Sequence, residues 1–502
     1  MTYGRPGVYI SETLLPAPIT SVGTANAAGA VVAPFAQGPE AVTRVTSWYE
    51  FASTFGGYNA AFPATFGVAS FFNNGGRELF VKRLLHSDAS NATVSVKTSG
   101  NVTVFTATAK NRGTDGNNLR VTVEDGTVDG TYTLTVYKEG VAGTGSDITN
   151  DTLLERYENI VFDAPTSSDY AETVINMISP NISISNSAAG VPVMTNPYPL
   201  STGSNGTTVV ADDYTDYNSG TAFDEFTSLD RALVLFFPNI FQTLSADQDL
   251  VYASAISWAE ANDGFVVVET APNLTTSAAM TYASGFGSHS NAAVYFPHFY
   301  TTDPLGRSTQ ALRKIGPSGA IAGLYLGTDA TRGVFKAPAG ISLPLSGIVS
   351  MEKSFSSSEL DILNSGASPV NPIRQVPGAG IAVMGARTLK QDGTANKYVN
   401  MRRSLIYIKK RLKASTEFAI FENNDEILWA RIRTVLNLFL NEYRNQGGLR
   451  GATSADAYFI KCDAQNNSAA SIQNGEVHIQ VGVALQYPAE FIVIDLSQKT
   501  LN

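Results

Sequence analysis

Two continuous apolar runs, RALVLFFP at residues 231–238 and DGFVVVETAP at residues 263–272, indicate the fold class of this chain. Runs of this kind are typical of parallel strands that helices bury on both faces of a sheet. The stretch between them, DLVYASAISWAEAN at 249–262, reads as a helix. Because strand, helix and strand follow one another in this order, the sequence predicts an α/β unit with a parallel sheet.

The same alternation occurs on both sides of these runs. Ser47 is followed by Glu50 three residues later, which is the spacing of a capping box at the start of a helix. The expected flanking elements are strands at 29–35, 78–85 and 291–304 and helices at 47–56 and 63–76. We therefore expect one α/β domain that is built from two separated stretches of the chain.

Between these two stretches, residues 91–200 have a different pattern. ATVSVKT, NVTVFTATA, LRVTVED and TYTLTVYKEG alternate apolar and polar residues between turns that contain Gly, Asn and Asp. This alternation is typical of antiparallel strands with one face exposed to solvent. The sequence predicts a β-rich outer domain inserted into the α/β domain.

The last part of the chain contains two expected helices and two expected strands. The helix expected over 397–413 carries an apolar stripe, with most of its basic residues on the other side. The second helix is expected over 423–448, with Asn423 as its cap. DAYFIKCD at 456–463 and GEVHIQVGVAL at 475–485 are the expected strands.

The predicted fold class is thus a multidomain α+β and α/β protein with extended arms at both ends. The C-terminal domain is expected to combine a mixed sheet with helices. The expected division is an N-terminal arm (1–22), a discontinuous α/β middle domain (23–90 and 201–368), an inserted β-rich outer domain (91–200), a C-terminal domain (369–488) and a C-terminal arm strand (489–502).

The charge of the chain is unevenly distributed. The whole chain has 34 Lys and Arg against 44 Asp and Glu, a net charge of −10, which argues against a nucleic-acid binder. Residues 374–450 alone hold 14 basic and 6 acidic residues. Such a basic zone on an acidic protein indicates either a preferred contact face or pairing with acidic residues of the same or a neighbouring copy.

The sequence carries no pattern of a catalytic, metal or cofactor site. The four histidines have no metal-ligand spacing, and Ser288 and His289 read as polar turn residues. The single cysteine, Cys462, excludes an intramolecular disulfide framework and reads as a buried structural thiol. The chain has no run of eighteen apolar residues and no signal-peptide pattern at its start. We therefore expect neither an enzyme, a cofactor nor membrane insertion.

Both ends of the chain contain strand-like segments, YGRPGVYISE from Tyr3 and YPAEFIVIDLS from Tyr487. In the second segment both alternating sets of side chains are apolar, so both faces of such a strand need to be covered. Proline residues in the first segment favour an edge strand or an extended arm. The turn at Tyr487 and Pro488 reads as a flexible join.

The order of several motifs resembles the tail sheath proteins of contractile bacteriophages and related contractile injection systems. The similar segments are RPGVYISE (5–12), SFFNNGGRELFVKRL (70–84), RGVFKAPAG (332–340), VNPIRQVPGAGIAVMGARTL (370–389), KYVNMRRSLIYIKK (397–410), FAIFENNDEILW (418–429) and GEVHIQVGVALQYPAEFIVIDLSQ (475–498). They cover roughly two thirds of the chain and leave out the insertion.

The resemblance implies strand exchange between subunits, in which each arm adds a strand to a sheet of a neighbour. The exchanged residues would be Val8, Tyr9, Ile10, Phe491, Ile492, Val493, Ile494 and Leu496. The acceptor sheet would contain Tyr458, Phe459, Ile460, Val477, Ile479 and Val481. Contacts with an inner tube would come from Arg402, Arg403, Lys409, Lys410 and Lys413, with the helix that carries Arg431 and Arg433 as the competing element.

The implied function is that of a structural sheath. Hexameric rings would stack helically around an inner tail tube, joined by baseplate and tail terminator proteins. Contraction would drive the tube through the host envelope for genome delivery, without direct nucleic-acid contact. The implied location is the virion tail, assembled in the host bacterial cytoplasm. Alternatives are a phage-derived injection particle that delivers no genome, an intracellular α/β hydrolase, and an adhesin or surface-layer protein.

Overall fold

The computed structural model describes residues 27–140, 150–186, 190–194, 197–215, 222–365 and 368–490. The described residues form two compact units. One contains 27–406 together with 485–490, and the other contains 407–484. The boundary between the units lies within helix α10, whereas the sequence places a domain boundary at 369, so the predicted domain division stays a prediction.

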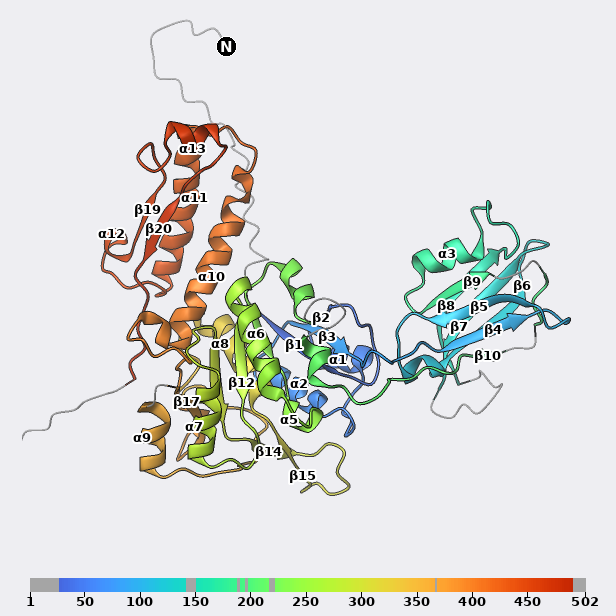
Figure 1. The fold of residues 1–502 in the computed structure, drawn as a ribbon, viewed down its shortest axis with the longest axis horizontal. Helices are drawn as coiled ribbons and strands as arrows, with labels where there is room; N and C mark the ends of the chain where they lie inside the picture. Colours follow the sequence, from blue (N-terminus) through green and yellow to red (C-terminus); the bar gives the residue numbers. More distant parts are fainter. Residues whose placement is uncertain are drawn as a thin grey trace, which may run out of the picture. The chain divides into compact units, whose positions relative to one another are not determined.

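The larger unit contains an eight-stranded sheet with six parallel strands at its centre (Figure 1). Strands β18 and β2 close its two edges in antiparallel orientation. In order across the sheet the strands are β18 (Gly380–Val383), β17 (Val370–Val376), β13 (Ala292–Phe296), β12 (Phe265–Glu269), β11 (Leu233–Phe236), β1 (Ala28–Pro34), β3 (Leu79–Leu84) and β2 (Thr43–Val45). The parallel sheet predicted from the two apolar runs is confirmed by β11 and β12.

Helices cover both faces of this sheet, which explains why the central strands β1, β11, β12 and β13 are almost entirely apolar. Val31 and Val267 face one core and Val32 and Val268 face the other, because successive side chains of a strand point to opposite faces. The covering helices are α1 (Trp48–Phe55), α2 (Ala64–Asn73) and α8 (Ser318–Arg332) on the first face, and α4 (Ala211–Thr215), α5 (Ile240–Thr243), α6 (Gln248–Asn262) and α7 (Thr276–Gly285) on the second.

Helix α1 begins at the predicted cap. The Ser47 side chain accepts a hydrogen bond from the backbone N–H of Glu50 at 3.2 Å. The return bond differs from the expected capping box, since the Glu50 carboxylate accepts from the backbone N–H of Thr46 rather than of Ser47. Helix α9 (Ser357–Ser365) and a small antiparallel sheet of β15 (Leu312–Ile315), β14 (Phe299–Thr302) and β16 (Ser350–Met351) complete this part of the chain.

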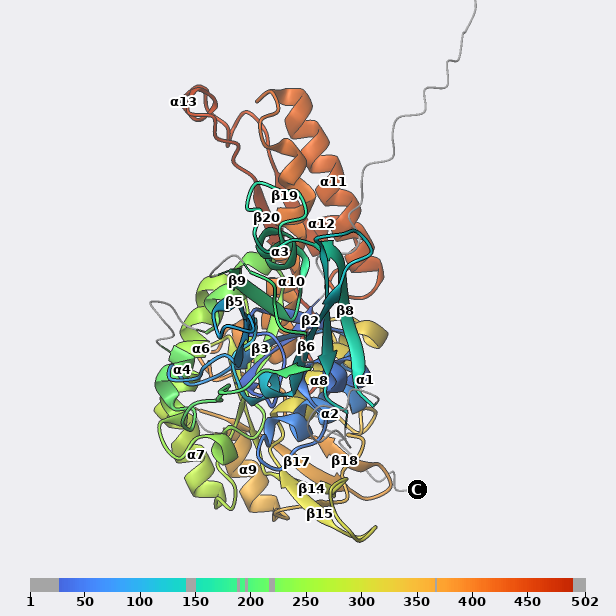
Figure 2. The same cartoon turned by 90° about the vertical axis from the view of Figure 1, so that its right-hand side faces the viewer.

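The inserted stretch has its own core and its own two sheets, in which every described pairing is antiparallel. Figure 2 shows this group, with α3 beside β9. The strands are β4 (Thr93–Lys97), β5 (Thr103–Ala109) and β9 (Ile182–Asn186) in one sheet, and β10 (Tyr198–Pro199), β6 (Leu119–Asp125), β7 (Tyr132–Lys138) and β8 (Thr152–Ile160) in the other, with helix α3 (Ala171–Ile178). The antiparallel strands predicted from the alternating pattern are confirmed.

The smaller unit consists mainly of two long helices and a strand pair (Figure 1). Its elements are α10 (Val399–Thr416), which begins in the larger unit, α11 (Glu426–Asn445), α12 (Ser454–Ala457), β19 (Tyr458–Lys461), α13 (Ala469–Gln473) and β20 (Gln480–Val483). The predicted cap Asn423 is wrong, because Asp425 accepts from the Leu428 N–H at 2.8 Å and begins α11. An acidic cap also suits the positive end of the helix dipole.

Candidate functional site

Strands β19 and β20 form an antiparallel pair in the smaller unit. Tyr458 lies opposite Val483, and Ile460 lies opposite Val481. Within the described ranges no third strand pairs with either of them. Each strand therefore keeps one edge at which a further strand can form backbone hydrogen bonds.

One face of this pair lies on α11. Its core consists of five buried residues, Leu428, Trp429, Ile432, Leu436 and Cys462. Four of the six predicted acceptor residues pack partly buried against this core, namely Ile460, Val477, Ile479 and Val481. Only the last part of the expected strand 475–485 is a strand, because β20 begins at Gln480, so Val477 and Ile479 precede it.

The other face of the pair is open. Phe459 is 53% exposed and lies opposite Gly482 in the register. A Cβ atom added to Gly482 would lie 2.1 Å from the Phe459 ring, so glycine is what permits the ring to lie across the neighbouring strand. Tyr458, by contrast, is buried. The pair thus presents an exposed aromatic ring and open edges, and its other face packs against α11.

Cys462 is buried in the core behind the pair, as predicted. Burial raises the pKa of its thiol, and the nearby charge of Arg433 only partly opposes this effect. A protonated, enclosed thiol behaves as a small apolar side chain. Cys462 therefore acts as part of the packing that supports β19.

The five basic residues predicted to contact a tube lie in different environments. Arg403 has only 4% of its side chain exposed and forms a two-point ion pair with Asp329 of α8, at 3.0 and 2.5 Å. Its guanidinium also lies 4.6 Å above the Tyr325 ring. The prediction that Arg403 contacts a partner is wrong for this structure, because the side chain is enclosed within its own unit.

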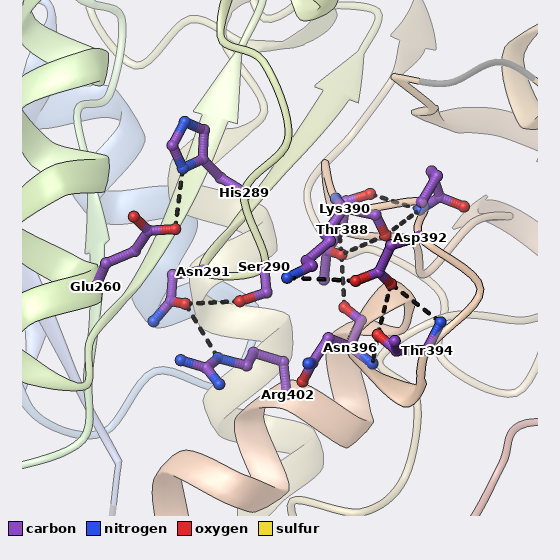
Figure 3. A network of polar contacts seen from close by, with 11 residues as sticks. Glu260, His289, Ser290, Asn291, Thr388, Lys390, Asp392, Thr394, Asn396 and Arg402 are labelled. Carbon is purple, nitrogen blue, oxygen red and sulfur yellow. Dashed lines mark hydrogen bonds and ion pairs between the residues drawn. The ribbon is translucent and has the colours of Figure 1, made fainter.

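Arg402 also points into the larger unit rather than away from it. Its Nε donates to the Asn291 side-chain oxygen at 3.0 Å, as Figure 3 shows. Asn291 is fully buried and in turn donates to the backbone oxygens of Ala259 and Gly264. Arg402 thus connects the start of α10 to the segment before β13.

The remaining predicted contacts lie further along α10. Lys409 and Lys413 are exposed, and Lys410 is partly exposed. On the competing helix α11, Arg431 lies 4.5 Å above the Phe418 ring and Arg433 donates to the Cys462 backbone oxygen. Arg431 is exposed and Arg433 is partly exposed, so both helices present accessible basic side chains.

A further polar cluster surrounds Glu490, the last residue that the structure describes. Its carboxylate accepts hydrogen bonds from Arg387, Asn364 and Tyr398. A cavity of about 500 Å³ lies beside it, lined by Arg332, Lys336, Asn400 and the segment 487–490. Sequence reasoning missed this cluster, because 103 residues separate Arg387 from Glu490 and no local pattern connects them.

Ser288 and His289, which the sequence predicts to be polar turn residues, lie in the irregular segment before β13. His289 pairs with Glu260 at 2.9 Å (Figure 3). In the described part of the chain, no three His, Cys, Asp or Glu residues are placed to hold a metal ion. None of the helices in the described ranges is both long and apolar enough to span a membrane.

Comparison with known proteins assigns the fold. Residues 391–499 match the family model of the phage tail sheath C-terminal domain. The contracted sheath of the anti-feeding prophage aligns over 99% of this chain and 100% of its own, with a TM-score of 0.60 and 20% identity. The chain has the fold of a contractile tail sheath protein. The predicted fold class and the resemblance read from the motifs are therefore confirmed.

Two further relatives are similar to this chain, one in its fold and the other over part of its sequence. The sheath tail protein of Listeria innocua aligns over 92% of this chain and 96% of its own, with a TM-score of 0.60 and 14% identity. The tail sheath protein of Vibrio phage KVP40 is 24% identical over 179 residues, which is 36% of this chain and 26% of that protein. The match thus spans about a quarter of that relative. The sheath family region, 391–499, contains the β19–β20 pair and the exposed lysines of α10.

The predicted exchange residues of the two arms, Val8 to Ile10 and Phe491 to Leu496, lie outside the described residues. Their role as exchanged strands stays a prediction.

Proposed function

We propose that this chain is the sheath subunit of a contractile tail or contractile injection particle. Hexameric rings of the subunit stack helically around an inner tail tube, bounded by baseplate and terminator proteins. Contraction of the sheath drives the tube through the envelope of a target cell. The observation that carries the proposal is the β19–β20 pair, which has open edges, a rigid apolar support and a place inside the sheath family region.

Subunits are joined by strands from the two arms of neighbouring copies. A strand added to the edge of β19 or β20 gains backbone hydrogen bonds, and its alternate side chains set the register. Phe491 to Leu496 suit this position, because the apolar side chains on one face would cover the exposed Phe459 side of the pair. The other face of the added strand would extend the contact with the helices.

The work of contraction comes from contacts between subunits, so the mechanism needs neither catalysis nor a cofactor. Specific protein interfaces bury about 1,600 Å² in total. A gain of even a few kcal/mol per subunit becomes large when it is summed over many copies. The subunit is thus a structural protein of the tail, assembled in the cytoplasm of the host. We propose that the tail belongs to a phage virion and delivers a genome, and the alternative is a phage-derived injection particle that delivers none.

The open strand pair predicts the effect of removing the C-terminal arm. Truncation after Glu490 removes 12 residues and leaves every described contact of the subunit in place. We expect the truncated chain to fold but to lose striated tubes in negative-stain electron microscopy, with and without the tube protein. The matched control ends after Leu496, keeps the apolar strand and should still form tubes. Normal tubes from the chain that ends at Glu490 would contradict strand exchange by this arm.

The exposed lysines of α10 are the proposed contacts with the inner tube. Lys409 and Lys413 are four residues apart and so lie on the same side of the helix. Replacing both with glutamate should reduce cosedimentation with the tube protein roughly tenfold, since each exposed ion pair contributes up to about 1 kcal/mol. The control reverses Lys97 and Lys110, which changes the net charge equally in the insertion. Equal binding by both variants would place the tube contact elsewhere.

A further inference from the structure

Glu490 is the last residue that the structure describes, and side chains of the larger unit hold its carboxylate. Arg387 donates to both carboxylate oxygens of Glu490, from Nε to Oε1 and from Nη2 to Oε2, each at 2.8 Å. Asn364 donates to Oε1 at 3.1 Å, and the Tyr398 hydroxyl donates to Oε2 at 3.1 Å. Four hydrogen bonds from three separate segments therefore hold this one carboxylate. We call this group the Glu490 clamp.

The residues of the clamp are themselves anchored in the body of the larger unit. Asn371 of β17 accepts from the Arg387 N–H at 2.8 Å and donates to the Arg387 backbone oxygen at 2.8 Å. Arg387 also donates from Nη1 to the Asn364 backbone oxygen at 2.6 Å, which connects it to α9. Tyr398 directly precedes α10. A force applied at Glu490 is thus passed to the eight-stranded sheet and to two helices.

The clamp has the features of a strong ion pair. The side chains of Arg387 and Glu490 are only 15% and 19% exposed. Two parallel charged hydrogen bonds are stronger and more specific in direction than a single neutral one. Burial alone would raise the pKa of the Glu490 carboxyl, but the hydrogen bonds from Arg387 and Asn364 hold that pKa below its ordinary value. Glu490 is therefore ionised and paired at neutral pH.

We propose that the Glu490 clamp is the mechanical anchor of the C-terminal arm. It fixes the point at which residues 491–502 leave the subunit and passes tension from that arm into the sheet. The inference rests on the proposed sheath function. Twelve extended residues reach at most about 40 Å, so the position of the exit point decides which neighbouring sheet the arm can join.

The segment just before the clamp is also held in place by contacts with the subunit. The sequence suggests a flexible join at Tyr487 and Pro488, but the Tyr487 ring packs edge-on against Tyr398, with ring centres 6.5 Å apart. Asn400 additionally donates to the Gln486 backbone oxygen at 3.4 Å. Residues 486–490 are thus held on the subunit, so the predicted join at Tyr487 and Pro488 is tied to α10 and the residue before it.

The test is the substitution Glu490→Gln in the full chain, which keeps the size of the side chain and removes its charge. In unassembled subunits, we expect amide hydrogen exchange in the segment 485–490 to become roughly tenfold faster, on the scale of charged hydrogen bonds. In assembly with the tube protein, we expect tubes to become shorter or absent. Tyr398→Phe removes a single hydrogen bond and should produce smaller changes in the same direction.

The matched control is Glu158→Gln, in an Arg–Glu pair with both side chains more than half exposed. It should leave the exchange of segment 485–490 and tube length unchanged. Unchanged exchange in Glu490→Gln would overturn the clamp, and faster exchange with normal tubes would overturn its mechanical role. If the unmodified chain forms no tubes with the tube protein, the proposed function fails, and the role of the clamp in assembly fails with it.

Discussion

Replacing Arg403 with alanine is expected to lower the free energy of unfolding of the larger unit by about 3–5 kcal/mol. The reason is that Asp329 of α8, whose side chain is only 11% exposed, would lose its two-point partner. Burial already raises the pKa of the Asp329 carboxyl, and the charge of Arg403 opposes that rise. The cation–π contact of Arg403 with Tyr325 would be lost as well. Urea unfolding followed by circular dichroism measures the difference.

Two comparisons separate the buried pair from a general effect of removing arginine. Arg156→Ala breaks an exposed pair with Glu158 and should cost less than about 1 kcal/mol. The double substitution Arg403→Met with Asp329→Leu removes both charges and should recover most of the lost stability, because apolar replacement of a buried pair is often neutral. A stable Arg403→Ala variant that no longer binds the tube protein would restore Arg403 as a tube contact.

Replacing Ile432 with alanine is expected to destabilise the smaller unit by about 2–5 kcal/mol. Ile432 is fully buried at the centre of the core behind β19 and β20. That core has five buried residues, and the other hydrophobic residues packed against it are only partly buried, so the loss of the Ile432 side chain removes contacts from its most enclosed part. Hydrogen exchange resolved by segment should show faster opening of 426–483, whereas the eight-stranded sheet keeps its protection.

This substitution also tests the strand pair as an assembly element. A loosened support lets β19 and β20 move, so the variant should form fewer tubes than the unmodified chain at the same concentration. Ile427→Ala is the matched control on the same helix, since Ile427 is 79% exposed and its removal should change stability by less than about 0.5 kcal/mol. Similar stability of the two variants would contradict the role assigned to this core.

Most secondary structure could be predicted, because the signals for it are local. The apolar runs at 231–238 and 263–272 became β11 and β12, and the alternating residues 91–200 became antiparallel strands. Ends of elements were less predictable. Asn423 and Asp425 are both good capping residues, and only the backbone geometry selected Asp425. Likewise, Val477 and Ile479 continue the apolar pattern of β20 without belonging to it.

The sheet type, the apolar residues near both ends and the lack of catalytic motifs could all be read from the sequence. Each of these follows from residue types at short spacing. The folded chain was needed to show that Arg403 is buried against Asp329, which is 74 residues away, and that Arg387 holds Glu490 across 103 residues. Charged residues on a helix look alike in sequence, whether they face solvent or a buried partner. Their role depends on which distant carboxylate the fold brings within hydrogen-bonding distance.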